Sequence, residues 1–202
     1  MPFSAQLGDQ MVSRYGGRKA LLRHWRHMLH YRLGGFSAYR AIHWERVERV
    51  CFVCTGNICR SPFAESVALN LGLDSRSCGL NLTEGSPADE TAQRIALDFG
   101  TNLSAHRSRR FVAAEVGGGD LIVAMEPVQA EEILTGLSPS ATAQITLLGL
   151  WAENPRPYLH DPYGQDDPYF QECFRIIDES VRRLDSLITA GQVRPQDSAA
   201  SM

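Results

Sequence analysis

A cysteine and an arginine on either side of a short turn-forming segment are the residues of this chain best suited to chemistry. Cys54 ends an apolar run, Arg60 precedes a Ser-Pro pair, and the segment between them contains Gly56 and Asn57. Glycine and asparagine readily adopt the left-handed backbone conformation, which lets successive backbone N–H groups point inward as an anion-binding nest. The sequence therefore predicts a loop that binds a phosphate-sized dianion at the N-terminus of a helix.

The two side chains suggest a reaction for this loop. Amide dipoles, a helix N-terminus and an arginine all favour a thiolate over a thiol, so we expect Cys54 to be a nucleophile at neutral pH. The guanidinium of Arg60 can hold two phosphoryl oxygens while the sulfur attacks phosphorus in line. A cysteine that ends a buried strand is usually a small core residue. Here the strand, the turn formers, the helix cap at Ser61-Pro62 and the arginine all agree with catalysis.

Residues 53–62 read Val-Cys-Thr-Gly-Asn-Ile-Cys-Arg-Ser-Pro. This string resembles the signature Cys-x-Gly-Asn-x-Cys-Arg-Ser-Pro of the low-molecular-weight protein tyrosine phosphatase family. The resemblance covers about residues 47–187 and looks closest to bacterial members that accompany polysaccharide export and act on tyrosine autokinases. It implies hydrolysis of a phosphotyrosine protein, such as a tyrosine autokinase, through a cysteinyl phosphate and without a cofactor. It also implies that the phosphoryl group is bound by Thr55, Gly56, Asn57, Ile58, Cys59 and Ser61.

The resemblance further implies a general acid in an Asp-Pro-Tyr segment, and the chain offers two such triplets, at Asp161 and at Asp167. A proton donor is needed because an alkoxide or phenoxide leaves poorly. Asp161 lies in a segment rich in Pro and Gly, whereas Asp167 with Pro168 has the pattern of a helix N-cap and first residue. An Asp-Pro pair in a loop is, taken alone, more often turn chemistry. With the cysteine loop present, we choose Asp161.

Four residues match the family positions that hold the loop in place. The resemblance implies that Asn57 adopts a strained conformation supported by His106, Ser77 and Ser61, and that Ser61 donates to the thiolate. The alternative for His106 is an ordinary surface histidine.

Three residues in or near the loop bear on substrate and regulation: Ile58, Cys59 and Tyr163. A tyrosyl ring is long enough to reach Cys54 while stacking on Tyr163 and Ile58, which favours aryl over alkyl phosphates. Cys59 could form a reversible disulfide with Cys54 under peroxide. The chain departs from the family pattern after the third predicted strand, where Glu126 stands in place of the usual aspartate.

Two other functions compete with a phosphatase. A thiol-dependent arsenate reductase has the same fold and loop, but it needs two further cysteines for a disulfide relay. Residues 120–148 contain no cysteine, and Cys173 stands alone in the last predicted helix. A phosphate-binding regulatory scaffold would not need both Cys54 and Asp161. No cysteine and histidine cluster has the spacing of a metal site, so no metal is expected.

The periodicity predicts an α/β fold in which strands and helices alternate. It comprises a doubly wound, four-stranded parallel sheet with helices on both faces and the phosphate-binding loop after the first strand. The predicted strands are 47–53, 74–80, 120–125 and 143–148. The predicted helices are 18–33, 37–45, 62–71, 88–99, 128–134 and 167–188.

Length and composition favour one catalytic domain at 47–190, a basic helical N-terminal extension at 1–46 and a disordered tail at 191–202. The chain has 202 residues, 44% of them hydrophobic, and five irregularly spaced cysteines. An odd cysteine count and no signal peptide point to a reducing compartment, and we expect the cytoplasm. The longest nearly apolar run, 145–152, is too short to span a bilayer.

The N-terminal extension differs in charge from the rest of the chain. Residues 1–49 carry nine Arg or Lys and three Asp or Glu, a net charge of +6, whereas the whole chain carries −3. Residues 18–33 form a basic amphipathic helix, and residues 1–13 are expected to be mobile. We expect its apolar stripe to pack on the catalytic domain or a second subunit. An anionic membrane surface is the next alternative, and nucleic acid is not expected.

Overall fold

The sheet of the computed structural model has four parallel strands, as predicted, and their order is β2-β1-β3-β4. The structure describes residues 14–197, with side chains described through 193; the segment 1–13, expected to be mobile, lies outside them. The strands are β1 (Arg49–Cys54), β2 (Ser75–Gly79), β3 (Asp120–Ala124) and β4 (Gln144–Leu147). Each lies within a residue or two of its predicted range.

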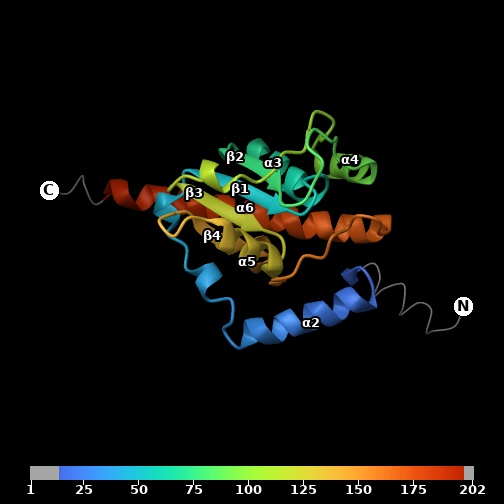
Figure 1. Ribbon diagram of the computed structural model, residues 1–202, viewed down its shortest axis with the longest axis horizontal. Coiled ribbons are helices and arrows are strands. Elements are labelled where there is room, and N and C mark those ends of the chain that lie inside the picture. The colour runs from blue at the N-terminus through green and yellow to red at the C-terminus, as the bar shows by residue number, and fades with distance from the viewer. Residues whose placement is uncertain (1–13, 198–202) are drawn as a thin grey trace, which may run out of the picture.

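Strand residues alternate between two cores, because successive side chains of a strand point to opposite faces. On one face Phe52 and Val123 pack with the helices α3 (Arg60–Asn70), α4 (Glu90–Ala96) and α6 (Asp167–Asp197). On the other face Val53 and Ile122 pack with α5 (Pro127–Gly136). In Figure 1 the sheet lies between these helices, with α5 on the side nearer to the N-terminal helix. The predicted coverage of both faces is confirmed.

The N-terminal segment completes the second face. Phe36 is only 4% exposed and belongs to the core on the α5 side, where Tyr31 and Tyr39 pack against it. The helix predicted for 37–45 is wrong: two short 3-10 turns, Ala38–Arg40 and Trp44–Arg46, replace it. These turns let the chain follow the sheet edge rather than leave it, so this part of the extension belongs to the folded core.

Helix α2 (Arg18–Arg32) lies at the periphery of the molecule, apart from the sheet, in the lower part of Figure 1. It is held through side chains rather than close backbone packing. The ring of His27 stacks on Tyr158 with centroids 5.3 Å apart, and Arg23 Nη1 donates to Tyr158 Oη at 3.3 Å.

The C-terminal boundary differs from the expected one. Helix α6 continues to Asp197, so the disordered tail predicted from Gly191 is wrong for 191–197; residues 198–202 lie outside the described part. The helix is amphipathic, and Phe170, Phe174 and Ile177 of its early turns are buried. Gln192 Nε2 donates to the Val47 carbonyl at 2.9 Å, which ties the later turns to the segment just before β1. None of the helices within 14–197 is both long and apolar enough to cross a bilayer.

Candidate active site

The predicted anion-binding loop joins β1 directly to α3. Cys54, the last residue of β1, is 3% exposed; its Sγ lies 3.0 Å from Ser61 Oγ and accepts a hydrogen bond from the Asn57 N–H at 3.2 Å. The expected cap at Ser61 is wrong, because the helix begins at Arg60 with Cys59 in the N-cap position. The Ser61 hydroxyl faces the sulfur instead. Two groups able to donate hydrogen bonds therefore converge on one sulfur, which suits a sulfur that must both attack and leave.

Asn57 holds the loop in shape. Its φ of 51° is the one positive value among non-glycine residues in the described part of the chain. Such a conformation costs energy and persists only where the surroundings fix it. The side chain is fully buried; Nδ2 donates to Ser61 Oγ at 2.9 Å and to Ser77 Oγ at 2.8 Å, and Oδ1 accepts from the Arg109 N–H at 2.9 Å.

His106 supports the same residue from its backbone side. Its Nε2 lies 2.7 Å from the Asn57 carbonyl oxygen; because a carbonyl only accepts, Nε2 must carry the proton. Burial lowers the pKa of His106, which favours the neutral ring. Ser77 Oγ in turn donates to Glu65 Oε2 at 2.5 Å, and Glu65 pairs with Arg109 at 2.8 Å. All four residues expected to surround the loop are therefore in one network.

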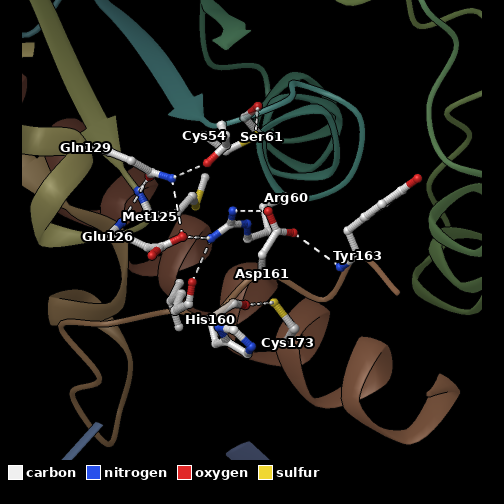
Figure 2. Close-up of polar contacts among 12 residues, drawn as sticks. Cys54, Arg60, Ser61, Met125, Glu126, Gln129, His160, Asp161, Tyr163 and Cys173 are labelled. Carbon is white, nitrogen blue, oxygen red and sulfur yellow. Dashed lines mark hydrogen bonds and ion pairs between the residues drawn. The ribbon is translucent and has the colours of Figure 1, made fainter. Parts of the chain in front are cut away.

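Arg60 is completely buried and held by carboxylates on both sides (Figure 2). Nη1 donates to Glu126 Oε1 at 2.6 Å and to the Leu159 carbonyl at 2.8 Å, and Nη2 donates to Asp161 Oδ2 at 2.6 Å. Burial works against the charge, but Asp161 and Glu126 outweigh it and raise the pKa of Arg60. Its Nε has no hydrogen-bond partner among the described residues. A buried cation with an unused donor is suited to bind an anion.

A cavity of about 170 Å³ opens above the sulfur. Asp161 and Tyr163 reach it from the segment before α6, and Asp161 Oδ1 accepts from the Tyr163 N–H at 3.2 Å. The Tyr163 ring is exposed at the rim (Figure 2). The cavity is lined by Cys54, Thr55, Gly56, Ile58, Cys59, Asp161 and Tyr163.

Asp167 lies elsewhere. It is the first residue of α6 and pairs with Arg94 at 2.7 Å, with both side chains more than half exposed. The hydrogen bond from Arg94 lowers the pKa of Asp167. Of the two Asp-Pro-Tyr triplets, only the one beginning at Asp161 lines the cavity.

The remaining cysteines near the site are buried. Cys59 is 2% exposed, and burial raises its pKa; a disulfide between Cys59 and Cys54 stays a prediction. Burial also raises the pKa of Cys173 to about 12. In residues 14–197 no three His, Cys, Asp or Glu side chains are grouped so that they could hold a metal ion.

Three residues that support the site were not predicted as site residues: Glu126, Glu65 and Gln129. Glu126 binds Arg60 and also caps α5, where its side chain and that of Gln129 form a capping box. Gln129 Nε2 reaches back to Thr55 Oγ1 at 3.1 Å (Figure 2). The place of Glu126 in the sequence could have marked it as a site residue, because it directly follows β3 at the edge where parallel sheets bind ligands. Glu65 and Gln129 lie inside helices, and no sequence signal marks them.

Comparison with known proteins identifies the family of this chain. The sequence profile of the family described as low molecular weight phosphotyrosine protein phosphatase matches residues 49–193. The chain belongs to this family. The match leaves α2 outside and extends slightly beyond the predicted end of the catalytic domain at 190.

The low-molecular-weight phosphatases that resemble this chain include bacterial enzymes. Low molecular weight protein-tyrosine-phosphatase Etp of Escherichia coli K12 is 31% identical over 133 residues, which cover 65% of this chain and 88% of Etp. In the crystal structure of the tyrosine phosphatase Wzb from Escherichia coli K30 in complex with sulphate, the sequence is 30% identical to this chain and the TM-score is 0.63. The match covers 69% of this chain and 97% of Wzb. An arginine phosphatase from Geobacillus stearothermophilus, YwlE, shares the fold at 24% identity and a TM-score of 0.64, covering 73% of this chain and 96% of YwlE.

These findings establish a protein-tyrosine-phosphatase of the low-molecular-weight family, a hydrolase with the cysteine-based mechanism general to the family. They favour neither an arsenate reductase nor a scaffold. A buried Cys173 in α6 is also poorly placed for a disulfide relay.

Proposed function

We propose that this phosphatase hydrolyses phosphotyrosine in proteins through a cysteinyl phosphate on Cys54, with Arg60 binding the phosphoryl group and Asp161 acting as general acid and then base. The observation that carries the proposal is that the Cys54 sulfur and the Asp161 carboxyl line the same cavity of about 170 Å³, with Arg60 ion-paired to Asp161 at 2.6 Å.

In the first step the Cys54 sulfur attacks phosphorus, the bond from phosphorus to the tyrosyl oxygen breaks, and Asp161 gives its proton to that oxygen. The Nε–H of Arg60 and the backbone amides of the loop bind the phosphoryl oxygens. A phosphoryl dianion competes with Asp161 for the guanidinium and adds a negative charge beside the carboxyl. Both effects favour the protonated acid that this step requires.

In the second step Asp161, now a carboxylate, takes a proton from water. The water oxygen attacks phosphorus, the bond from phosphorus to sulfur breaks, and inorganic phosphate leaves. Ser61 Oγ, 3.0 Å from the sulfur, donates a hydrogen bond to the departing thiolate. The side chains of Asn57, Ser77 and His106 act as positioning groups, since they hydrogen-bond in the network that supports the loop and do not line the cavity.

The depth of the sulfur supports an aryl substrate. Cys54 is nearly inaccessible at the base of the cavity, while Tyr163 and the partly buried Ile58 lie at its wall and rim. A tyrosyl ring spans that depth and stacks on Tyr163, whereas a phosphoserine side chain is too short. We further propose a cytoplasmic setting, where Cys54 stays reduced, and a tyrosine autokinase as the physiological substrate.

The test is phosphate release from peptides that carry phosphotyrosine, phosphoserine or phosphoarginine. We expect the wild-type enzyme to prefer phosphotyrosine strongly and Cys54→Ser to release none, and we expect rapid quenching to trap labelled phosphate on the wild-type protein. Cys51→Ala is the matched control, because Cys51 lies on the same strand but packs on the opposite face. Equal release by wild type and Cys54→Ser would refute the nucleophile. Comparable rates on phosphoserine or phosphoarginine would refute the substrate class.

A further inference from the structure

The apolar stripe of α2 faces outward. Four large apolar side chains recur at helical spacing and are exposed: Leu22 at 73%, Trp25 at 54%, Leu29 at 61% and Leu33 at 77%. They lie on one face, because residues three and four apart are neighbours on a helix. The expectation that this stripe packs on the catalytic domain is therefore wrong for these side chains. A contiguous apolar surface of this kind marks an interaction site.

The opposite face of α2 holds the helix on the domain. Ala20 is buried, and His24, His27 and Tyr31, at the same helical spacing, are partly buried. His27 stacks on Tyr158, and Arg23 donates to the hydroxyl of that tyrosine. Because these contacts fix the helix from its inner side, the exposed stripe does not result from a detached helix. The domain itself presents the stripe to the surroundings.

The positive charges of α2 favour an anionic lipid surface as its partner. Helix α2 contains no aspartate or glutamate, and its cationic residues are Arg18, Lys19, Arg23, Arg26 and Arg32. By helical spacing Arg26 and Arg32 lie at the two borders of the apolar stripe and Arg18 continues its line toward the helix N-terminus. Apolar residues between cationic borders match the boundary of an anionic lipid surface, where the apolar side enters the acyl region and the arginines meet the headgroups.

A second copy of the chain fits this surface less well. A symmetric dimer would place the same patch against itself and bring two sets of arginines together without a carboxylate on either helix. An anionic bilayer supplies the opposite charge instead. The rest of the chain, residues 50–202, carries a net charge of −9, so such a surface repels it and attracts residues 1–49 at +6.

We propose that α2 docks the phosphatase on anionic lipid bilayers through Leu22, Trp25, Leu29 and Leu33, with Arg18, Arg26 and Arg32 contacting the headgroups. This inference goes beyond the proposed function and does not depend on it. The docked helix lies in the interface plane, since it is too short and too basic to span. The catalytic domain then acts on substrates at or near that membrane.

The experiment measures binding of the full-length protein to vesicles of phosphatidylglycerol and phosphatidylethanolamine, with pure phosphatidylcholine vesicles for comparison. We expect sedimentation with the anionic vesicles, weakening as salt is raised, and a blue shift of Trp25 emission on binding. Trp44 and Trp151 are already partly buried, so Trp25 dominates the change. Leu22→Gln combined with Leu29→Gln should reduce the partition coefficient about tenfold or more. Arg18→Glu combined with Arg26→Glu should abolish the preference for anionic lipid.

Leu69→Gln combined with Leu97→Gln is the matched control, because both side chains are more than half exposed and lie on α3 and just after α4, helices that cover the sheet face opposite the α5 side where Phe36 packs. Turnover of p-nitrophenyl phosphate checks that every variant is folded, since none of these residues lines the active-site cavity. Unchanged vesicle binding by the α2 variants would overturn the proposal, as would equal binding to both lipid compositions. If the wild type does not bind vesicles but forms a dimer that Leu29→Gln dissociates, the stripe belongs to an interface with a second copy. If the protein binds duplex DNA and not vesicles, the stripe belongs to a nucleic-acid site.

Discussion

At the scale of single residues, the choice between the two aspartates has a direct kinetic test. Asp161 lines the cavity beside Arg60, whereas Asp167 is paired with Arg94 at the start of α6. General-acid help is worth about 10²–10⁴-fold and matters most for poor leaving groups. Asp161→Asn should therefore slow phenyl phosphate far more than p-nitrophenyl phosphate and flatten the pH profile.

Asp167→Asn is the matched control and should leave both rates close to wild type. Its exposed partner Arg94 makes any loss of stability small. If the leaving-group dependence appears in the Asp167 variant instead, the general acid belongs to the second triplet.

A second prediction concerns Glu126, which receives a charge-assisted hydrogen bond from Arg60 at 2.6 Å. Such bonds contribute about 1.5–3 kcal/mol, so Glu126→Gln should lower kcat/KM for aryl phosphates roughly 10- to 100-fold by loosening the guanidinium. Glu126→Asp keeps the charge and should recover part of the loss. Glu132→Gln, on the exposed side of the same helix, is the control. Wild-type kcat/KM in Glu126→Gln would show that Asp161 and the Leu159 carbonyl suffice to hold Arg60.

At the scale of elements, the β1 strand and the loop after it could be predicted because local signals agree there: an apolar strand, turn formers and a helix start lie in one continuous stretch. The N-terminal extension could not be predicted in the same way. Its amphipathic pattern reveals an apolar stripe but not the side on which the domain lies. Contacts such as His27 on Tyr158 join residues far apart in the chain, and these decide which face is buried.

Buried aromatic residues that precede β1 change the expected effect of truncation. Every expected catalytic residue lies after residue 46, so the sequence alone favours nearly intact turnover when residues 1–46 are removed. Phe36, however, is buried in the core, and Trp44 packs edge-on against Trp151 with centroids 4.9 Å apart. Loss of a buried aromatic costs about 3–5 kcal/mol, so the 1–46 truncation should lower Tm by about 10 °C or more.

Removal of residues 1–33 deletes α2 but keeps Phe36 and Trp44, and should lower Tm much less. Calorimetry of both truncations with turnover of a small aryl phosphate distinguishes the two cases. Equal Tm losses would mean that α2 contributes as much to the fold as the segment that follows it.

At the scale of the whole molecule, partly buried histidines make stability depend on pH in the acid range. Burial, followed by the cations Arg156 and Arg14 and by His27, lowers the pKa of His24 to about 4, and the rings of Tyr15 and Trp25 lie beside it. In the unfolded chain a histidine titrates near pH 6.5, about the ordinary value. Between about pH 6.5 and 4 the unfolded state therefore binds more protons than the folded state. Stability is complete above that range and falls as pH drops through it.

Three further histidines act in the same direction, because burial also lowers the pKa of His27, His106 and His160. We expect Tm to fall between pH 7.5 and pH 4.5, at about 2–4 °C for each kcal/mol lost. His24→Gln removes one of these groups and should reduce that fall, whereas His43→Gln, whose side chain is 63% exposed, should leave it unchanged. Because His24 and His27 lie on the inner face of α2, the same acidification should weaken the hold of this helix on the domain before the sheet unfolds. An identical pH dependence of Tm in wild type and His24→Gln would show that His24 is protonated at the same pH in the folded and unfolded chain.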